Sequence, residues 1–249
     1  MVALGPAFPH ATSSCPDPYS TFYLDVAAAQ LAEWLPTSPP MAILDLSRAA
    51  GRFARQLAAD GHTVVHAVPR LADAGGLPSP GVLPLVADSR HLSWLRDSCL
   101  DAVLAEAGAL CFSLAAEETV ADIARVLRPQ GRVLVCVESL VLGLSRLAEQ
   151  GLWAELADAP SADVVLVPSP DGTITRCFWP EELRALLIDA GFHLDWIRPR
   201  SVLPQAVVER ALADDPLSLP MLVRTEVALA AERESDPVGI HLVASARLA

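Results

Sequence analysis

Positive charge is scarce in this sequence. Its 249 residues include 18 lysine and arginine residues against 30 aspartate and glutamate residues, which gives a formal net charge of −12. Nucleic acid and anionic membrane surfaces would repel such a chain, and its basic residues are scattered rather than gathered into one patch. The sequence therefore argues against nucleic acid and membranes as partners.

Cysteine and histidine do not form a metal-binding or disulfide pattern. The five cysteines are widely spread, no two have the C-x-x-C spacing, and the six histidines do not cluster with them. A zinc site or a disulfide framework needs such groupings. We therefore expect neither a bound metal nor a structural disulfide.

Long uncharged apolar runs are also missing. The richest apolar stretch, residues 100–116, contains Asp101 and Glu106, so nothing is expected to span a bilayer. Residues 1–15 lack the basic start of a signal peptide, and prolines interrupt them. We expect a cytoplasmic protein in which residues 1–18 form a flexible leader and residues 19–249 form a single domain.

Short apolar runs alternate with helical patterns along most of the chain. Strands are expected at residues 41–47, 63–68, 82–87, 100–105, 132–137, 192–197 and 239–247. Helices are expected at residues 19–35, 51–60, 113–128, 180–190, 204–213 and 217–232. This order predicts a three-layer αβα, Rossmann-like fold with a mostly parallel, seven-stranded sheet. The last strand follows without an ordinary crossover, so we expect it to be antiparallel.

Residues 139–178 depart from this alternation. A predicted helix at 140–156 leads into two short strand-like runs, at 164–167 and 172–177. We interpret this region as an inserted lid or small sheet within the domain.

The turn after the first strand is the strongest indication of a binding site. In residues 41–51, an apolar run ends at Asp45, small residues follow, and a helical pattern then begins. Ligands of open α/β sheets bind outside the carboxyl ends of the strands, and a helix start offers unpaired backbone N–H groups. The turn therefore predicts a site for a nucleotide-like cofactor. The P-loop, H-E-x-x-H, Ser-His-Asp and G-x-G-x-x-G signatures are all absent.

Five segments, in this order, resemble motifs of the class I S-adenosylmethionine-dependent methyltransferases. They are residues 45–51 for D-x-G-x-G-x-G, 86–89 for the acid ending the third strand, 98–104 for F-D-x-V, 125–132 for R-V-L-x-P-G-G, and 181–192 for E-E-L…A-G-F. The resemblance covers nearly the whole chain. It implies the fold described above, S-adenosylmethionine as the cofactor, and methyl transfer to a small-molecule substrate.

The resemblance also implies which residues contact the cofactor. They are Asp45, Ser47, Ala49, Gly51, Val68, Asp88 and Ser89. For three of them a purely structural role is open as well. Asp88 and Ser89 could instead cap a following helix, and Gly51 could simply allow close packing of a strand and a helix.

Three of these positions depart from the family pattern. Ser47 and Ala49 replace glycines, which reach positive φ easily and let the backbone approach the cofactor. Val68 replaces an acid that would bind the ribose hydroxyls. Together these changes could weaken cofactor binding by roughly one to three orders of magnitude. Two hypotheses stay open: a working methyltransferase, or an inactive scaffold that binds a protein partner or another small ligand.

Glu106 is a weak candidate for a catalytic base. It follows the fourth strand within an otherwise apolar run, and the alternative is a carboxylate exposed at the rim. Glu226 lies on an apolar helix face, so we expect it to pair with an arginine. Tyr19, Phe22 and Tyr23 either line a substrate site or anchor the first helix. The sequence indicates neither the methyl acceptor nor the oligomeric state.

Overall fold

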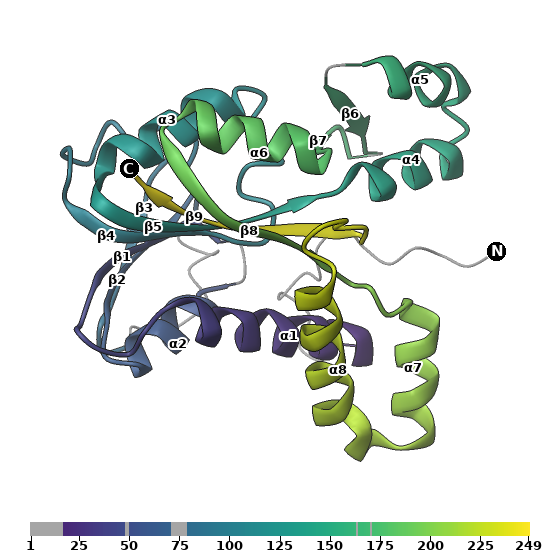
Figure 1. Ribbon diagram of the computed structural model, residues 1–249, viewed down its shortest axis with the longest axis horizontal. Coiled ribbons are helices and arrows are strands. Elements are labelled where there is room, and N and C mark those ends of the chain that lie inside the picture. Colours follow the sequence, from purple (N-terminus) through teal and green to yellow (C-terminus); the bar gives the residue numbers. More distant parts are fainter. Residues whose placement is uncertain (1–16, 48–49, 71–78, 163, 170) are drawn as a thin grey trace.

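The structure is a computed structural model, and it describes residues 17–47, 50–70, 79–162, 164–169 and 171–249. A seven-stranded sheet with the order β3-β2-β1-β4-β5-β9-β8 forms its centre, and helices cover both faces (Figure 1). Residues 1–16 of the expected leader and the cofactor candidate Ala49 lie outside the described residues. The rest of the expected leader belongs to the fold, because Asp17 caps the first helix by accepting the Ser20 amide at 2.9 Å.

The sheet confirms the predicted topology. Its strands are β1 (Ala42–Asp45), β2 (Thr63–Val68), β3 (Val82–Val86), β4 (Leu100–Ala105), β5 (Leu127–Glu138), β8 (Phe192–Arg200) and β9 (His241–Leu248). The strands from β1 to β5 pair in parallel, and β9 lies antiparallel between β5 and β8. The carboxyl ends of β1–β5 and of β8 therefore share one edge of the sheet, where β9 begins.

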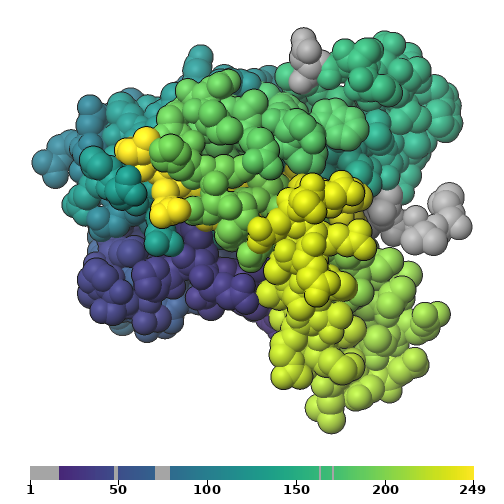
Figure 2. All heavy atoms as spheres, viewed as in Figure 1, coloured from purple at the N-terminus to yellow at the C-terminus, as the bar shows by residue number. Residues whose placement is uncertain are grey.

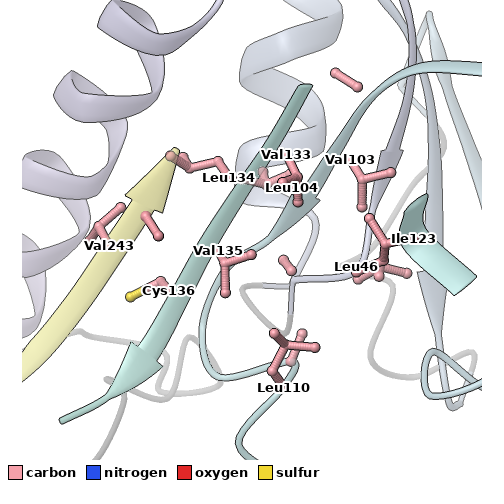
Figure 3. Packing of buried hydrophobic residues seen from close by; sticks show 14 of the residues in the cluster. Leu46, Val103, Leu104, Leu110, Ile123, Val133, Leu134, Val135, Cys136 and Val243 are labelled. Atoms are coloured by element: carbon pink, nitrogen blue, oxygen red, sulfur yellow. The ribbon is translucent and has the colours of Figure 1, made fainter. Parts of the chain in front are cut away.

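The core lies where the central strands meet the helices on either side. α1 (Pro18–Trp34) and α2 (Arg52–Ala59) cover one face, and α3 (Ala116–Val126) and α6 (Pro180–Asp189) cover the other (Figure 1). The central strands are buried on both faces, so their apolar runs are nearly continuous. Figure 3 shows Val103 from β4 with Leu46 and Ile123 of α3 close by, and Leu104 is the register partner of Leu134 from β5.

Near β3 and β4 the structure differs from one alternative and one helix boundary given by the sequence. No helix follows β3 in the described chain, so residues 89–99 form turns before β4. α3 begins at Ala116 rather than Ser113, whose buried hydroxyl lies 3.0 Å from that of Thr119. These differences leave Asp88 without a helix to cap.

The insertion contains the expected small sheet but not one long helix. Its elements are α4 (Leu140–Glu149), α5 (Trp153–Asp158), the short 3₁₀ helix η2 (Ala159–Ser161), and the strands β6 (Val165–Pro168) and β7 (Ile174–Cys177). Gly151, with φ 69°, separates the two α-helices in place of the single helix predicted at 140–156. β6 and β7 pair antiparallel as a separate sheet beyond the end of β5 (Figure 1).

A helical hairpin connects β8 to β9. α7 (Gln205–Asp214), the 3₁₀ helix η3 (Pro216–Ser218) and α8 (Leu219–Glu232) form it, and Val208 and Leu212 pack on Tyr19, Phe22 and Val26 of α1. The hairpin projects from the body of the molecule (Figure 2). In the described part of the chain, no helix is both long enough and apolar enough to cross a membrane.

Candidate functional site

The carboxyl edge of the sheet gathers most of the residues singled out in the sequence. Asp45 ends β1, Val68 ends β2, Asp88 follows β3 and Glu106 follows β4. The chain passes from β1 outward to β2 and β3 and then returns to β4 on the other side of β1. The carboxyl ends of β1 and β4 therefore form a topological switch point, which is where open α/β sheets bind ligands.

Asp45 acts on the protein's own turn. Its carboxylate is fully buried, and Oδ1 accepts the amide of Ser47 at 2.8 Å. The amide of Leu46 continues the sheet by donating to the Leu104 carbonyl at 2.8 Å. The side chain of Ser47 is buried, and its hydroxyl has no hydrogen-bond partner within the described residues. The start of the turn is thus held firmly and offers one unused hydroxyl.

Left-handed backbone occurs at the end of this turn rather than at its start. Ala50 has φ 48° and Gly51, which precedes α2, has φ 70°. Ser47 is not among the residues with positive φ, so serine at the first glycine position carries no strain of that kind. Ala50 does carry it, at a cost of roughly 1–2 kcal/mol.

The ends of β2 and β3 differ in polarity. Val68 is 2% exposed and offers no acceptor for a hydroxyl. The Asp88 side chain is 45% exposed and accepts hydrogen bonds from the amide and the guanidinium of Arg90 at 2.9–3.0 Å. The hydrogen bonds from Arg90 lower the pKa of Asp88. Ser89, next to Asp88, is partly exposed, so these two residues present a polar rim beyond β3.

Glu106 is buried and paired, not exposed at a rim. Arg200, at the end of β8, donates from Nη2 to Oε1 at 2.6 Å and from Nη1 to Oε2 at 3.0 Å. The two side chains are 2% and 1% exposed. Arg200 Nε also donates to Gln30 Oε1 of α1 at 2.7 Å. Both oxygens of this carboxylate are engaged by Arg200, which argues against Glu106 as a base.

The aromatic residues of α1 divide between two roles. Tyr19 and Phe22 anchor α1 on the α7–α8 hairpin. Tyr23 instead lies over the carboxyl edge, with its ring 5.3 Å from the Arg200 guanidinium carbon and 5.2 Å from the His241 ring. Burial raises the pKa of Tyr23. Of the three, Tyr23 is the one placed at the candidate site.

Sequence reasoning missed a third buried acid at this edge. Glu138, the last residue of β5, is fully buried, and its Oε2 accepts a hydrogen bond from Arg146 Nη1 of α4 at 2.6 Å. Burial raises the pKa of Glu138 to about 7, against the lowering effect of Arg146. Its sequence signal was an acid ending a strand of apolar residues, the same signal that singled out Asp45.

The expected arginine partner of Glu226 was wrong. Its carboxylate accepts the backbone amides of Val202 at 2.8 Å and Leu203 at 2.9 Å, just after Ser201, where φ is 65°. Burial raises the pKa of Glu226. This contact ties α8 to the chain that leaves β8.

Other features of the described chain lie apart from this edge. A cavity of about 300 Å³ between α3 and α6 is lined partly by Glu117, Arg176 and Glu182, and Arg176 pairs with both acids at 2.7–2.8 Å. None of the expected cofactor residues lines it. No three His, Cys, Asp or Glu side chains in the described ranges are placed to hold a metal ion.

Comparison with known proteins agrees with this architecture. Residues 44–135 match a family model described as "Methyltransferase domain". No curated protein sequence matches the chain.

Solved structures share the fold at low sequence identity. The 1,6-didemethyltoxoflavin-N1-methyltransferase of Burkholderia thailandensis, solved with bound 1,6-didemethyltoxoflavin and S-adenosylhomocysteine, is 20% identical, with a TM-score of 0.55 over 92% of this chain and 80% of that one. An S-adenosylmethionine-dependent methyltransferase from Mesorhizobium loti is 17% identical, with a TM-score of 0.57 over 89% of this chain and 97% of that one. The (4+2)-cyclase SpnF is 19% identical, with a TM-score of 0.56 over 90% of this chain and 80% of that one.

Proposed function

We propose that the chain is a class I S-adenosylmethionine-dependent methyltransferase that transfers a methyl group to a small molecule, because residues 44–135 match the methyltransferase family model and solved methyltransferases share its fold. One observation carries this proposal. The turn between β1 and α2 keeps its internal support, the Asp45–Ser47 hydrogen bond, and its left-handed Gly51 at the switch point of the sheet.

The described residues fit the cofactor at two of its three parts. The hydroxyl of Ser47, which has no partner within the described residues, and the start of α2 suit the polar methionine end, with Gly51 at the end of the turn. Asp88 and Ser89 suit the adenine as polar groups beyond β3. Val68 gives the ribose only apolar contact, so binding is weaker than with an acid at this position.

The bound cofactor supplies an activated methyl group on a sulfonium. The protein's part is to align the acceptor with that group and to exclude water. Arg200 occupies the carboxylate of Glu106, so the chain offers no free base at the end of β4. We therefore propose an acceptor atom that needs no base at this position, such as a neutral nitrogen or a hydroxyl that loses its proton readily.

A small acceptor is also part of the proposal. We assign the substrate lid to α1 and the insertion at residues 139–178, because Tyr23 of α1 lies over the carboxyl edge and α4 follows directly from β5. The Burkholderia thailandensis relative is named with a bound small-molecule substrate, which supports this class of acceptor. We also propose that the protein, whose formal net charge is −12, is cytoplasmic.

A second candidate is a scaffold that keeps the fold without using the cofactor. The side chains of Ser47 and Val68 are only 1% and 2% exposed, Arg90 engages Asp88, and Arg200 engages Glu106. These side chains are buried or already paired, which supports the second candidate. Such a protein would bind a protein partner or another small ligand instead of the cofactor.

Titration calorimetry with S-adenosylmethionine and S-adenosylhomocysteine separates the two candidates. Methyltransferase function predicts binding of both molecules in the micromolar range, with one site per chain. The absence of binding at millimolar ligand would reject methyl transfer and leave the scaffold. The cofactor analogue sinefungin, titrated in parallel, checks that binding follows the shape of the nucleoside and its amino acid.

A further inference from the structure

A buried polar contact lies directly behind the turn at the end of β1. His66 of β2 is the register partner of Asp45, and its Nδ1 lies 3.1 Å from Asp45 Oδ2. The His66 side chain is 1% exposed and that of Asp45 is 0% exposed. Neither group therefore reaches solvent.

These two groups lie close together without forming a hydrogen bond of normal geometry. Neither Asp45 Oδ2 nor either ring nitrogen of His66 has a hydrogen-bond partner within the described chain, and the polar atom 3.1 Å from Oδ2 is His66 Nδ1. A buried carboxylate oxygen without a compensating donor is costly. The other oxygen, Oδ1, accepts the amide of Ser47, so the orientation of the carboxylate also sets the position of that amide.

We propose that His66 is a positioning residue of the cofactor turn. Its Nδ1 lies beside Asp45 Oδ2 and limits how the carboxylate can turn, and the carboxylate in turn fixes the backbone of Ser47. His66 touches no ligand in this account. The identity of the ligand rests on the proposed function, whereas the chain of contacts from His66 to Ser47 does not.

A purely structural role is the competing hypothesis, and the chain offers a matched control for it. His62 is also a buried histidine, and its Nδ1 accepts the amide of Met41 at 3.1 Å. It lies just before β2, at the opposite edge of the sheet from the turn. Loss of either imidazole should lower stability, but only loss of His66 should disturb the turn.

The experiment compares the wild-type chain with four variants, H66N, H66Q, H66L and H62L. Asparagine places an amide N–H near the position of Nδ1, glutamine places one near Nε2, and leucine places none. Two quantities are measured: amide hydrogen exchange at Ser47 by NMR, without ligand, and the dissociation constant of S-adenosylhomocysteine by calorimetry. The comparison of H66N with H66Q decides the matter even if H66L does not fold.

The proposal predicts that H66L and H66Q speed exchange at Ser47 and weaken S-adenosylhomocysteine binding, each by about tenfold. H66N and H62L should stay within about threefold of the wild type in both quantities. The proposal is overturned if Ser47 exchange is the same in H66Q and H66N, or if H62L alters it as much as H66Q. A wild-type chain that binds no S-adenosylhomocysteine, yet shows the expected exchange pattern, would reject the proposed function and keep the contact chain.

Discussion

Arg200 and Glu106 face each other as a two-pronged ion pair that joins the end of β8 to the end of β4. The hydrogen bonds measure 2.6 and 3.0 Å, and Gln30 of α1 accepts a third hydrogen bond from the same guanidinium. The pair lies at the carboxyl edge, on the β4 side of the switch point. It thereby links α1 to the sheet and places at the site an ion pair whose two charges compensate each other.

Replacing Arg200 with leucine should destabilise the protein by about 3–5 kcal/mol, because Glu106 is then left buried without its cation. The double variant R200L/E106L should recover most of that loss, since an apolar pair needs no compensation. Urea unfolding measures both effects. Arg247, which pairs with Asp195 at 2.6 Å but is 48% exposed, is the control, and R247L should cost less than about 1 kcal/mol. Equal stability of R200L and R247L would contradict this account.

Glu138 should make stability depend on pH. Its pKa is raised to about 7 from a usual 4.5, so the folded state binds the proton more tightly than the unfolded state. The stability that this proton contributes is complete below about pH 4.5 and is lost as the pH rises through about 7. The free energy of unfolding of the wild type, relative to E138Q, should therefore fall by up to about 3 kcal/mol between pH 4.5 and 8.

Urea unfolding across this pH range tests the Glu138 prediction. E118Q, which alters an exposed acid at the start of α3, serves as the control and should keep a constant difference from the wild type. A constant difference for E138Q as well would show that the Glu138 carboxylate titrates normally.

Restoring an acid at the end of β2 should improve cofactor binding. V68D is expected to bind S-adenosylhomocysteine at least about tenfold more tightly, because the new carboxylate can accept the ribose hydroxyls. The same variant should melt at a lower temperature without ligand, since position 68 is buried. V68T keeps the shape of valine without a charge and should change affinity little. A lower melting temperature with no gain in affinity would place the ribose elsewhere.

Asp88 should contribute to binding through its rim position beyond β3. D88A is expected to weaken S-adenosylhomocysteine binding by about tenfold, the effect of one lost hydrogen bond to a charged group. D97A is the control, because Asp97 is 74% exposed and pairs with Arg125. Calorimetry that finds both variants equal to the wild type would remove Asp88 from the cofactor site.

The overall fold could be predicted because it depends on local patterns that repeat along the chain. The apolar runs marked β1, β2 and β4 closely, and the missing crossover before β9 indicated its antiparallel direction. The sequence was a poorer guide where one residue could take more than one structural role. A helix cap was the alternative to a cofactor contact for Asp88, but its carboxylate accepts from Arg90, and Gly151 divided a helical pattern in two.

The contacts of the candidate site could be predicted less well, because they join residues far apart in sequence. Glu106 was singled out correctly as an unusual acid, but nothing near it indicated Arg200, 94 positions later. Glu226 was recognised as needing a partner, yet backbone amides supplied it rather than an arginine. A sequence pattern shows that a buried charge needs compensation, whereas only the fold shows which group provides it.

The most direct test is a crystal structure of the protein with S-adenosylhomocysteine. Our account predicts the ligand across the carboxyl ends of β1, β2 and β3, with its amino acid end against the turn at Ser47 and its adenine near Asp88. Crystals that bind no ligand at this edge at saturating concentration, with Ser47 and Val68 still buried, would contradict it.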